Sequence, residues 1–221
     1  HCKFDDLVST KLDKNLAPFG ELLQSDFFKE VPLELFGINK NTLINIISEA
    51  PKQISAFINT LIEISQNYNL GKERFYFAVL RSFQELHDNN FPEIEDKAQS
   101  FALENNLKLG KNINVEHLQE ILTLQFGYEI KTENFESYGT LNNLRSLYIS
   151  EKKLLLLNEL LDESQRTFIF AKEIGFNVLE LNPRPNTYSW LDFSSFNELL
   201  NNYYASYFAG CILIPKNELV E

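Results

Sequence analysis

The sequence predicts a mainly helical α+β protein, in which a helical N-terminal segment precedes a second part that combines helices with a small sheet of about three strands. Apolar residues recur at three- and four-residue spacing along most of the 221 residues, which is the period of an amphipathic helix. After Gly127 the period shortens, which is typical of strands. With 44% hydrophobic and 13% aromatic residues, the chain has enough apolar side chain for a core, which argues against disorder.

The first 71 residues are predicted to form helices separated by prolines and glycine. Short amphipathic pieces are interrupted at Pro18 and Pro32, and a further break falls at Pro51. A clearer helix follows and ends near Gly71, because glycine readily adopts the left-handed conformation beyond a helix terminus. One apolar stripe defines this helix: Ile54, Phe57, Ile58, Leu61 and Ile64.

Two more helices complete the N-terminal region. One is expected over residues 72–88, and the next begins at Pro92, which suits a first helical turn. Gly110 then marks a linker. We therefore expect a helical linker or dimerisation region over residues 1–110 and a separate domain over residues 111–221.

The second half begins with a helix and then changes to strands. The helix is expected over residues 115–126, capped by Asn114 and stopped at Gly127. Two of the strands are expected to be joined by a turn near Glu151. The three predicted strand segments are residues 128–131, 144–150 and 152–158.

Capping signals predict the last two helices. Asp162 can cap the first of them while Gln165 reaches back to it, and this helix must end before Pro183. Ser195 and Glu198 have the S-x-x-E spacing that opens the second.

Charge and cysteine content narrow the classes of partner and location. The formal net charge is −11 and the pI is near 4.8, so this chain is not expected to bind nucleic acid broadly.

Cys2 and Cys211 do not make a disulfide framework, and we interpret them as reduced thiols of a cytoplasmic protein. No apolar run reaches the roughly 18 residues of a membrane span, so we expect no membrane partner. The absence of methionine favours a piece of a longer protein.

The residues with catalytic or ligand-binding chemistry are few. His1, His87 and His117 are far apart, so no zinc-site spacing occurs among them. No Gly-rich phosphate loop or G-x-S-x-G motif is present, and we expect no cofactor. The aromatic stripe Tyr203, Tyr204, Tyr207 and Phe208 is more typical of core packing than of a ligand pocket.

Two C-terminal segments carry a family resemblance. Residues 164–176, S-Q-R-T-F-I-F-A-K-E-I-G-F, resemble the active-site helix of ImmA/IrrE-type metallopeptidases, approximately Q-R-F-x-L-A-H-E-L-G-H. Residues 205–215, A-S-Y-F-A-G-C-I-L-I-P, resemble a later helix of that family. The resemblance covers roughly residues 112–221 and implies a zincin-like domain of helices with a small sheet.

The chain departs from this family at the metal. Lys172 and Phe176 stand where the resemblance places two zinc-binding histidines, and Glu173 stands at the general base. Asn202 lies in the stretch where a third, acidic ligand is expected. The resemblance therefore implies a pseudo-peptidase with no catalytic or metal-binding residues, because no metal would activate a water molecule. Lys172, Glu173, Phe176 and Asn202 are instead our candidates for binding a ligand in the former peptidase cleft.

Segments of the N-terminal region extend the resemblance. Residues 25–32, 49–51 and 85–95 resemble the middle of XRE-type transcriptional regulators related to the short-chain fatty acyl regulators. This implies the effector-sensing core of a bacterial regulator that lacks its helix-turn-helix head in this chain and contacts DNA only through that head. A homodimer and a small acidic or acyl effector are the expected partners. Two alternatives are an active zinc peptidase with unusual ligands and a purely structural dimerisation module.

Overall fold

The computed structural model describes residues 33–39, 72–110, 113–135, 144–185 and 193–214, together with scattered positions between residues 42 and 60. The predicted helices before residue 33 lie outside the described residues, as does most of the predicted stripe between residues 54 and 64.

The chain divides into two compact units, residues 1–88 and residues 89–221. The first contains the short 3-10 helix η2 (Leu33–Phe36) and α6 (Lys72–Leu86), which meet where the rings of Phe36 and Phe83 pack edge to face at 6.4 Å. The expected domain division at residue 110 differs from this structural boundary and stays a prediction.

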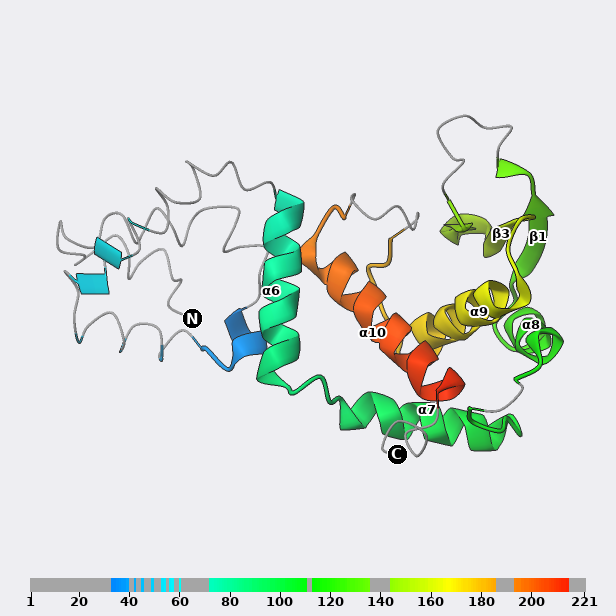
Figure 1. Ribbon diagram of the computed structural model, residues 1–221, viewed down its shortest axis with the longest axis horizontal. Helices are drawn as coiled ribbons and strands as arrows, with labels where there is room; N and C mark the ends of the chain where they lie inside the picture. The colour runs from blue at the N-terminus through cyan, green and yellow to red at the C-terminus, as the bar shows by residue number, and fades with distance from the viewer. Residues whose placement is uncertain are drawn as a thin grey trace. The chain divides into compact units, whose positions relative to one another are not determined.

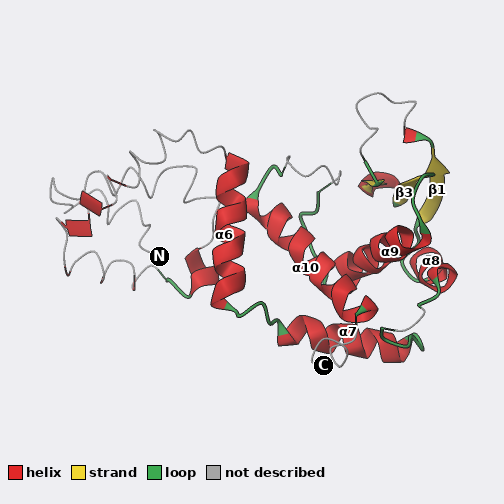
Figure 2. Cartoon of the chain, in the orientation of Figure 1, coloured by secondary structure: helices red, strands yellow, loops and turns green. Residues whose placement is uncertain are grey.

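The second unit has the predicted composition of helices and a small sheet (Figure 1). Figure 2 shows how far helices predominate, with the strands gathered in one small patch beside α9. The mainly helical α+β class is thereby confirmed. The elements are α7 (Pro92–Glu104), α8 (Val115–Leu124), β1 (Glu129–Glu133), β2 (Ser146–Ile149), β3 (Leu154–Asn158), α9 (Glu163–Val178) and α10 (Phe196–Leu213).

The helix ends follow the capping chemistry of the sequence. The Asn114 side chain accepts a hydrogen bond from the His117 backbone N–H at 3.1 Å, and Gly127 has a φ of 72° beyond α8. Asp162 and Gln165 form a complete capping box at the start of α9. At the start of α10 the Ser195 hydroxyl accepts from the Glu198 N–H, as predicted.

The three strands form one mixed sheet in the order β1-β3-β2. β3 is central, pairing parallel to β1 and antiparallel to β2. The predicted turn near Glu151 is the 3-10 helix η4 (Ser150–Lys152), and Lys153 follows it with a left-handed φ of 47°. The leucine-rich run therefore forms a strand, with Leu155 and Leu157 buried.

The core of this unit lies where α9 crosses α10 (Figure 1). A Cβ atom on Gly175 of α9 would lie 3.0 Å from the carbonyl oxygen of Ala205 and 3.0 Å from a ring carbon of Phe208. The two helices thus approach each other closely because residue 175 has no side chain. This crossing fixes α9, which holds the family-like segment, against α10.

The aromatic stripe of α10 packs against the residue that precedes α7. The ring of Phe91 contacts those of Tyr203, Tyr204 and Tyr207 edge to face at 5.2–5.7 Å. Phe208 is completely buried. The stripe therefore anchors the start of α7 to α10, as the core-packing interpretation expected.

Candidate functional site

A buried carboxylate lies at the centre of α9. The Glu173 side chain has an exposed fraction of 0%. Its Oε2 atom accepts a hydrogen bond from the Tyr128 hydroxyl at 3.0 Å and forms an ion pair with the Arg184 guanidinium. Because an ionised carboxylate is very costly to bury alone, these partners are what make its position tolerable.

The guanidinium of Arg184 lies between two aromatic rings. Its central carbon is 3.7 Å from the ring centroid of Tyr148 and 4.3 Å from that of Phe176. Its Nη1 atom donates to the Tyr128 hydroxyl at 3.0 Å, and the Tyr128 ring stacks on Tyr148 at 5.1 Å. A desolvated cation over aromatic faces is attracted by their negative π-systems. We call these five residues, Tyr128, Tyr148, Glu173, Phe176 and Arg184, the arginine cage.

Asn177 orients the cage from one helical turn further along α9. Its Nδ2 atom donates to the Tyr128 hydroxyl at 2.9 Å and to the Glu173 carbonyl at 2.7 Å. Since Asn177 and Arg184 both donate to the Tyr128 oxygen, its own hydrogen is directed to the Glu173 carboxylate. Burial, and then the negative charge of Glu173, raise the pKa of Tyr128 well above its usual range, so the hydroxyl stays protonated.

The segment after α9 brings Arg184 back to that helix. The Leu181 N–H donates to the Phe176 carbonyl at 3.0 Å, which folds the chain back at the helix end. The Asn201 side chain of α10 donates to the Pro183 carbonyl at 2.7 Å. These two contacts hold the loop just before Arg184, so that the arginine reaches an acid on the helix just completed.

Lys172 lies next to Glu173 and is only 7% exposed. Burial lowers its pKa to about 7, and although the charge of Glu173 opposes this shift, the charge of Arg184 adds to it. The site therefore holds two basic side chains, Lys172 and Arg184, and one acid, Glu173.

The depressed pKa of Lys172 predicts a pH-dependent cost of folding. Between about pH 7 and 10.5 the unfolded chain binds more protons at this residue, so the free energy of unfolding rises with pH across that window. Lys172→Met is expected to stabilise the protein by roughly 2 kcal/mol at pH 6, with the gain fading toward pH 10. Urea denaturation at several pH values measures this, with the exposed Lys97→Met as control. A gain of equal size at every pH would contradict the prediction.

Asn202, the fourth predicted residue, lies on α10. Its Oδ1 atom is buried and makes no hydrogen bond to the described residues, and its backbone carbonyl accepts from the Ser206 hydroxyl at 2.8 Å. The structure thus brings Glu173 and Phe176 together at Arg184, with Lys172 beside them. No described hydrogen bond joins Asn202 to that group.

Sequence reasoning missed Arg184, Tyr128, Tyr148 and Asn177. Arg184 stands between Pro183 and Pro185, which signal only the end of the helix and say nothing about where the arginine points. The usable signal was the buried acid itself: an acid on a buried helix face, without histidines beside it, requires another cation nearby.

The residues present do not fit a zinc ion. Phe176 offers no donor atom, Lys172 is not among the cysteine, histidine and carboxylate ligands that zinc takes in proteins, and Oε2 of Glu173 is engaged by both Tyr128 and Arg184. Within the described ranges no group of three His, Cys, Asp or Glu side chains could hold a metal ion. Lys172, Glu173 and Phe176 therefore do not form a zinc site.

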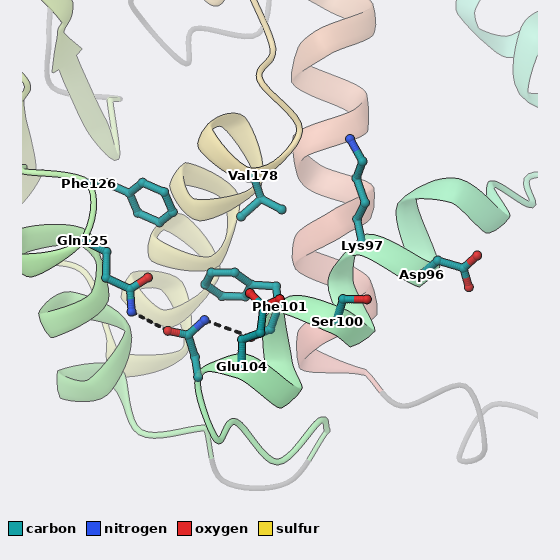
Figure 3. A pocket seen from close by; sticks show the side chains of 9 residues that line it. Asp96, Lys97, Ser100, Phe101, Glu104, Gln125, Phe126 and Val178 are labelled. Atoms are coloured by element: carbon teal, nitrogen blue, oxygen red, sulfur yellow. Dashed lines mark hydrogen bonds between the residues drawn. The ribbon is translucent and has the colours of Figure 1, made fainter.

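A cavity of about 460 Å³ lies elsewhere in the same unit (Figure 3). Phe101, Phe126 and Val178 form its apolar part, and at its edge the Gln125 side chain donates to Asn105. None of the four predicted ligand-binding residues lines this cavity. Ligand binding at those four residues stays a prediction.

One comparison with known proteins, against family models, agrees with the resemblance of the second half. Residues 126–221 match the family model Peptidase_M78, described as the IrrE N-terminal-like domain. A solved structure titled "Mycobacterium tuberculosis transcriptional regulator" is similar at 18% identity, with a TM-score of 0.49. That similarity covers 65% of this chain and 42% of the other, so this chain spans less than half of that protein chain. No curated protein matches.

No helix in the described part of the chain is both long enough and apolar enough to cross a membrane.

Proposed function

We propose that this chain is the regulatory core of a bacterial XRE-type transcriptional regulator, and that its IrrE-like domain is a scaffold without peptidase activity. The observation that carries the proposal is the ion pair between Glu173 and Arg184. Arg184 thereby engages Glu173, the residue that stands at the position of the general base. Lys172 and Phe176 stand at the positions of the two zinc-binding histidines. The match of residues 126–221 to the IrrE N-terminal-like domain supports the assignment of those positions.

The lack of peptidase activity follows from the chemistry that a zincin needs. Hydrolysis requires a metal ion to lower the pKa of a bound water molecule and a carboxylate to accept its proton. Here the carboxylate is completely buried, and Oε2 is already bound by a phenol and a guanidinium. A water molecule reaching Glu173 would have to displace Arg184 first.

The regulatory part of the proposal concerns DNA and an effector. DNA is contacted by a helix-turn-helix head that precedes this chain in the complete protein, which is consistent with the net charge of −11 found here. The effector is a small acid or acyl compound, because Lys172 and Arg184 place two basic side chains beside the single carboxylate of Glu173. Dimerisation is assigned to the helical N-terminal region.

A hydrolysis assay tests the absence of peptidase activity. The chain is incubated with zinc and a mixture of fluorogenic peptides, beside Glu173→Gln as the matched control. We expect both proteins to give only the background rate. Turnover that falls by about 100-fold or more in Glu173→Gln would show a working general base and would overturn the proposal.

DNA and effector binding test the regulatory role. The complete protein is expected to protect a defined site in footprinting on genomic fragments, whereas this chain alone protects none. In a thermal-shift screen of organic acids and acyl thioesters, at least one class is expected to raise the Tm, and Lys172→Met to abolish the rise. If the complete protein protects no DNA, the regulator assignment fails; if no compound shifts the Tm, the effector assignment fails.

A further inference from the structure

We infer that Arg184 is a built-in cation that occupies the place of the metal ion in this domain. The guanidinium, held in a cage of two rings, a phenol and a carboxylate, closes the site to divalent metals. This inference rests on the proposed function, because it takes the domain to be free of metal. It adds that Arg184 is the residue that excludes the metal and that the cage selects a guanidinium.

The position of the Arg184 guanidinium supports this inference. Residues four apart on a helix lie on one face, so a metal held by side chains at positions 172 and 176 would lie over that face and beside Glu173. The Arg184 guanidinium lies there in this structure. It pairs with Glu173, stacks on Phe176 and is close enough to Lys172 for its charge to lower the pKa of that lysine.

The chemistry of the cage suits a guanidinium. A guanidinium is planar and presents donors at its edge and a face for stacking. The cage matches both features, because Tyr148 and Phe176 cover the faces while Tyr128 and Glu173 accept from the edge. A surface ion pair has none of this enclosure, whereas here the Arg184 side chain is only 13% exposed. The cage therefore selects a guanidinium over a small divalent ion.

The charge of Arg184 also opposes the binding of a metal ion. A buried carboxylate requires a compensating cation, which in a zinc peptidase is the metal. In this chain Arg184 supplies that charge from the loop that follows the same helix. A divalent ion entering beside it would meet a fixed positive charge and would gain only one carboxylate that is already paired.

The test rebuilds the metal-binding residues with and without the arginine. Lys172→His with Phe176→His converts K-E-I-G-F at positions 172–176 into H-E-I-G-H, which is the spacing of a zinc-binding helix. Cobalt is then titrated into this double variant, and its visible absorption reports tetrahedral ligation. We expect the double variant to bind cobalt weakly, because Arg184 still occupies the site.

Removing the arginine from the double variant should then open the site. Adding Arg184→Ala is expected to tighten cobalt binding by about tenfold or more, since it removes both a like charge and a steric block. Arg184→Met is measured in parallel, because it keeps the packing between the rings and guards against failure of the alanine variant to fold. Adding the exposed Arg145→Ala to the double variant, the matched control, should leave the affinity unchanged.

The outcomes separate this inference from the proposed function. Cobalt affinity that is unchanged or weaker in both the Arg184→Ala and Arg184→Met backgrounds would overturn the inference, and so would equal tightening by Arg145→Ala. The proposed function is tested without these substitutions, by the hydrolysis assay on this chain and by footprinting with the complete protein. The inference can therefore fail while the proposed function stands, and the two failures give different results.

Discussion

Replacing Arg184 by alanine is expected to lower the free energy of unfolding by about 3–5 kcal/mol, because it leaves Glu173 as an unpaired charge in the interior. Glu173 is completely buried, and the Arg184 side chain is 13% exposed, so solvent screens their interaction little. The variant also loses the stacking on Tyr148 and Phe176. Urea denaturation followed by circular dichroism measures the loss.

Two further variants separate the charge effect from general damage. Arg145→Ala removes an exposed arginine next to β2 and is expected to change stability by less than about 0.5 kcal/mol. Adding Glu173→Gln to Arg184→Ala is expected to recover part of the lost stability, because it removes the buried charge that had no partner. A loss below about 1 kcal/mol for Arg184→Ala would show that the ion pair is not the main support of Glu173.

Replacing Gly175 by valine is expected to lower the free energy of unfolding by about 2–3 kcal/mol. Even a Cβ atom at this position would lie 3.0 Å from the Ala205 carbonyl oxygen, which is backbone and cannot rotate away. The added methyl groups must therefore separate α9 from α10 or distort one of them. Because Glu173 and Phe176 flank this crossing on α9, the cage should be disturbed as well.

Gly210→Val is the matched control for Gly175→Val. Gly210 also lies within a helix, on α10, but a Cβ atom there has no neighbour within 4 Å. Since valine is a slightly better helix former than glycine, this change should be within about 0.5 kcal/mol of the original protein. Similar losses in both variants would mean that the α9–α10 approach does not set the stability of this unit.

The helix boundaries were predictable because their signals are local. Pro92, Asn114 and the Asp162–Gln165 box each act within one turn of the helix that they start, so a few neighbouring residues suffice to place it. The sheet was predictable only in outline. Its first strand begins one residue later than expected and runs to Glu133, because the parallel pairing with β3 rather than local composition sets its length.

The candidate site was predictable only where it lies on one helix. Lys172, Glu173 and Phe176 share a short segment, so helical geometry alone puts them together. Tyr128 lies 45 residues before Glu173, and strand pairing and packing bring it there. Arg184 depends on how the loop folds back after α9, which helical periodicity does not encode. The sequence therefore did not predict that Arg184 pairs with Glu173.

The zinc content of the unmodified protein tests the central claim most directly. The chain is equilibrated with excess zinc, passed through a desalting column and analysed by plasma mass spectrometry. If Arg184 is the cation of this site, retained zinc should stay below about 0.1 equivalent per chain, and it should be equally low in Glu173→Gln. One equivalent of zinc retained by the unmodified chain would contradict the account.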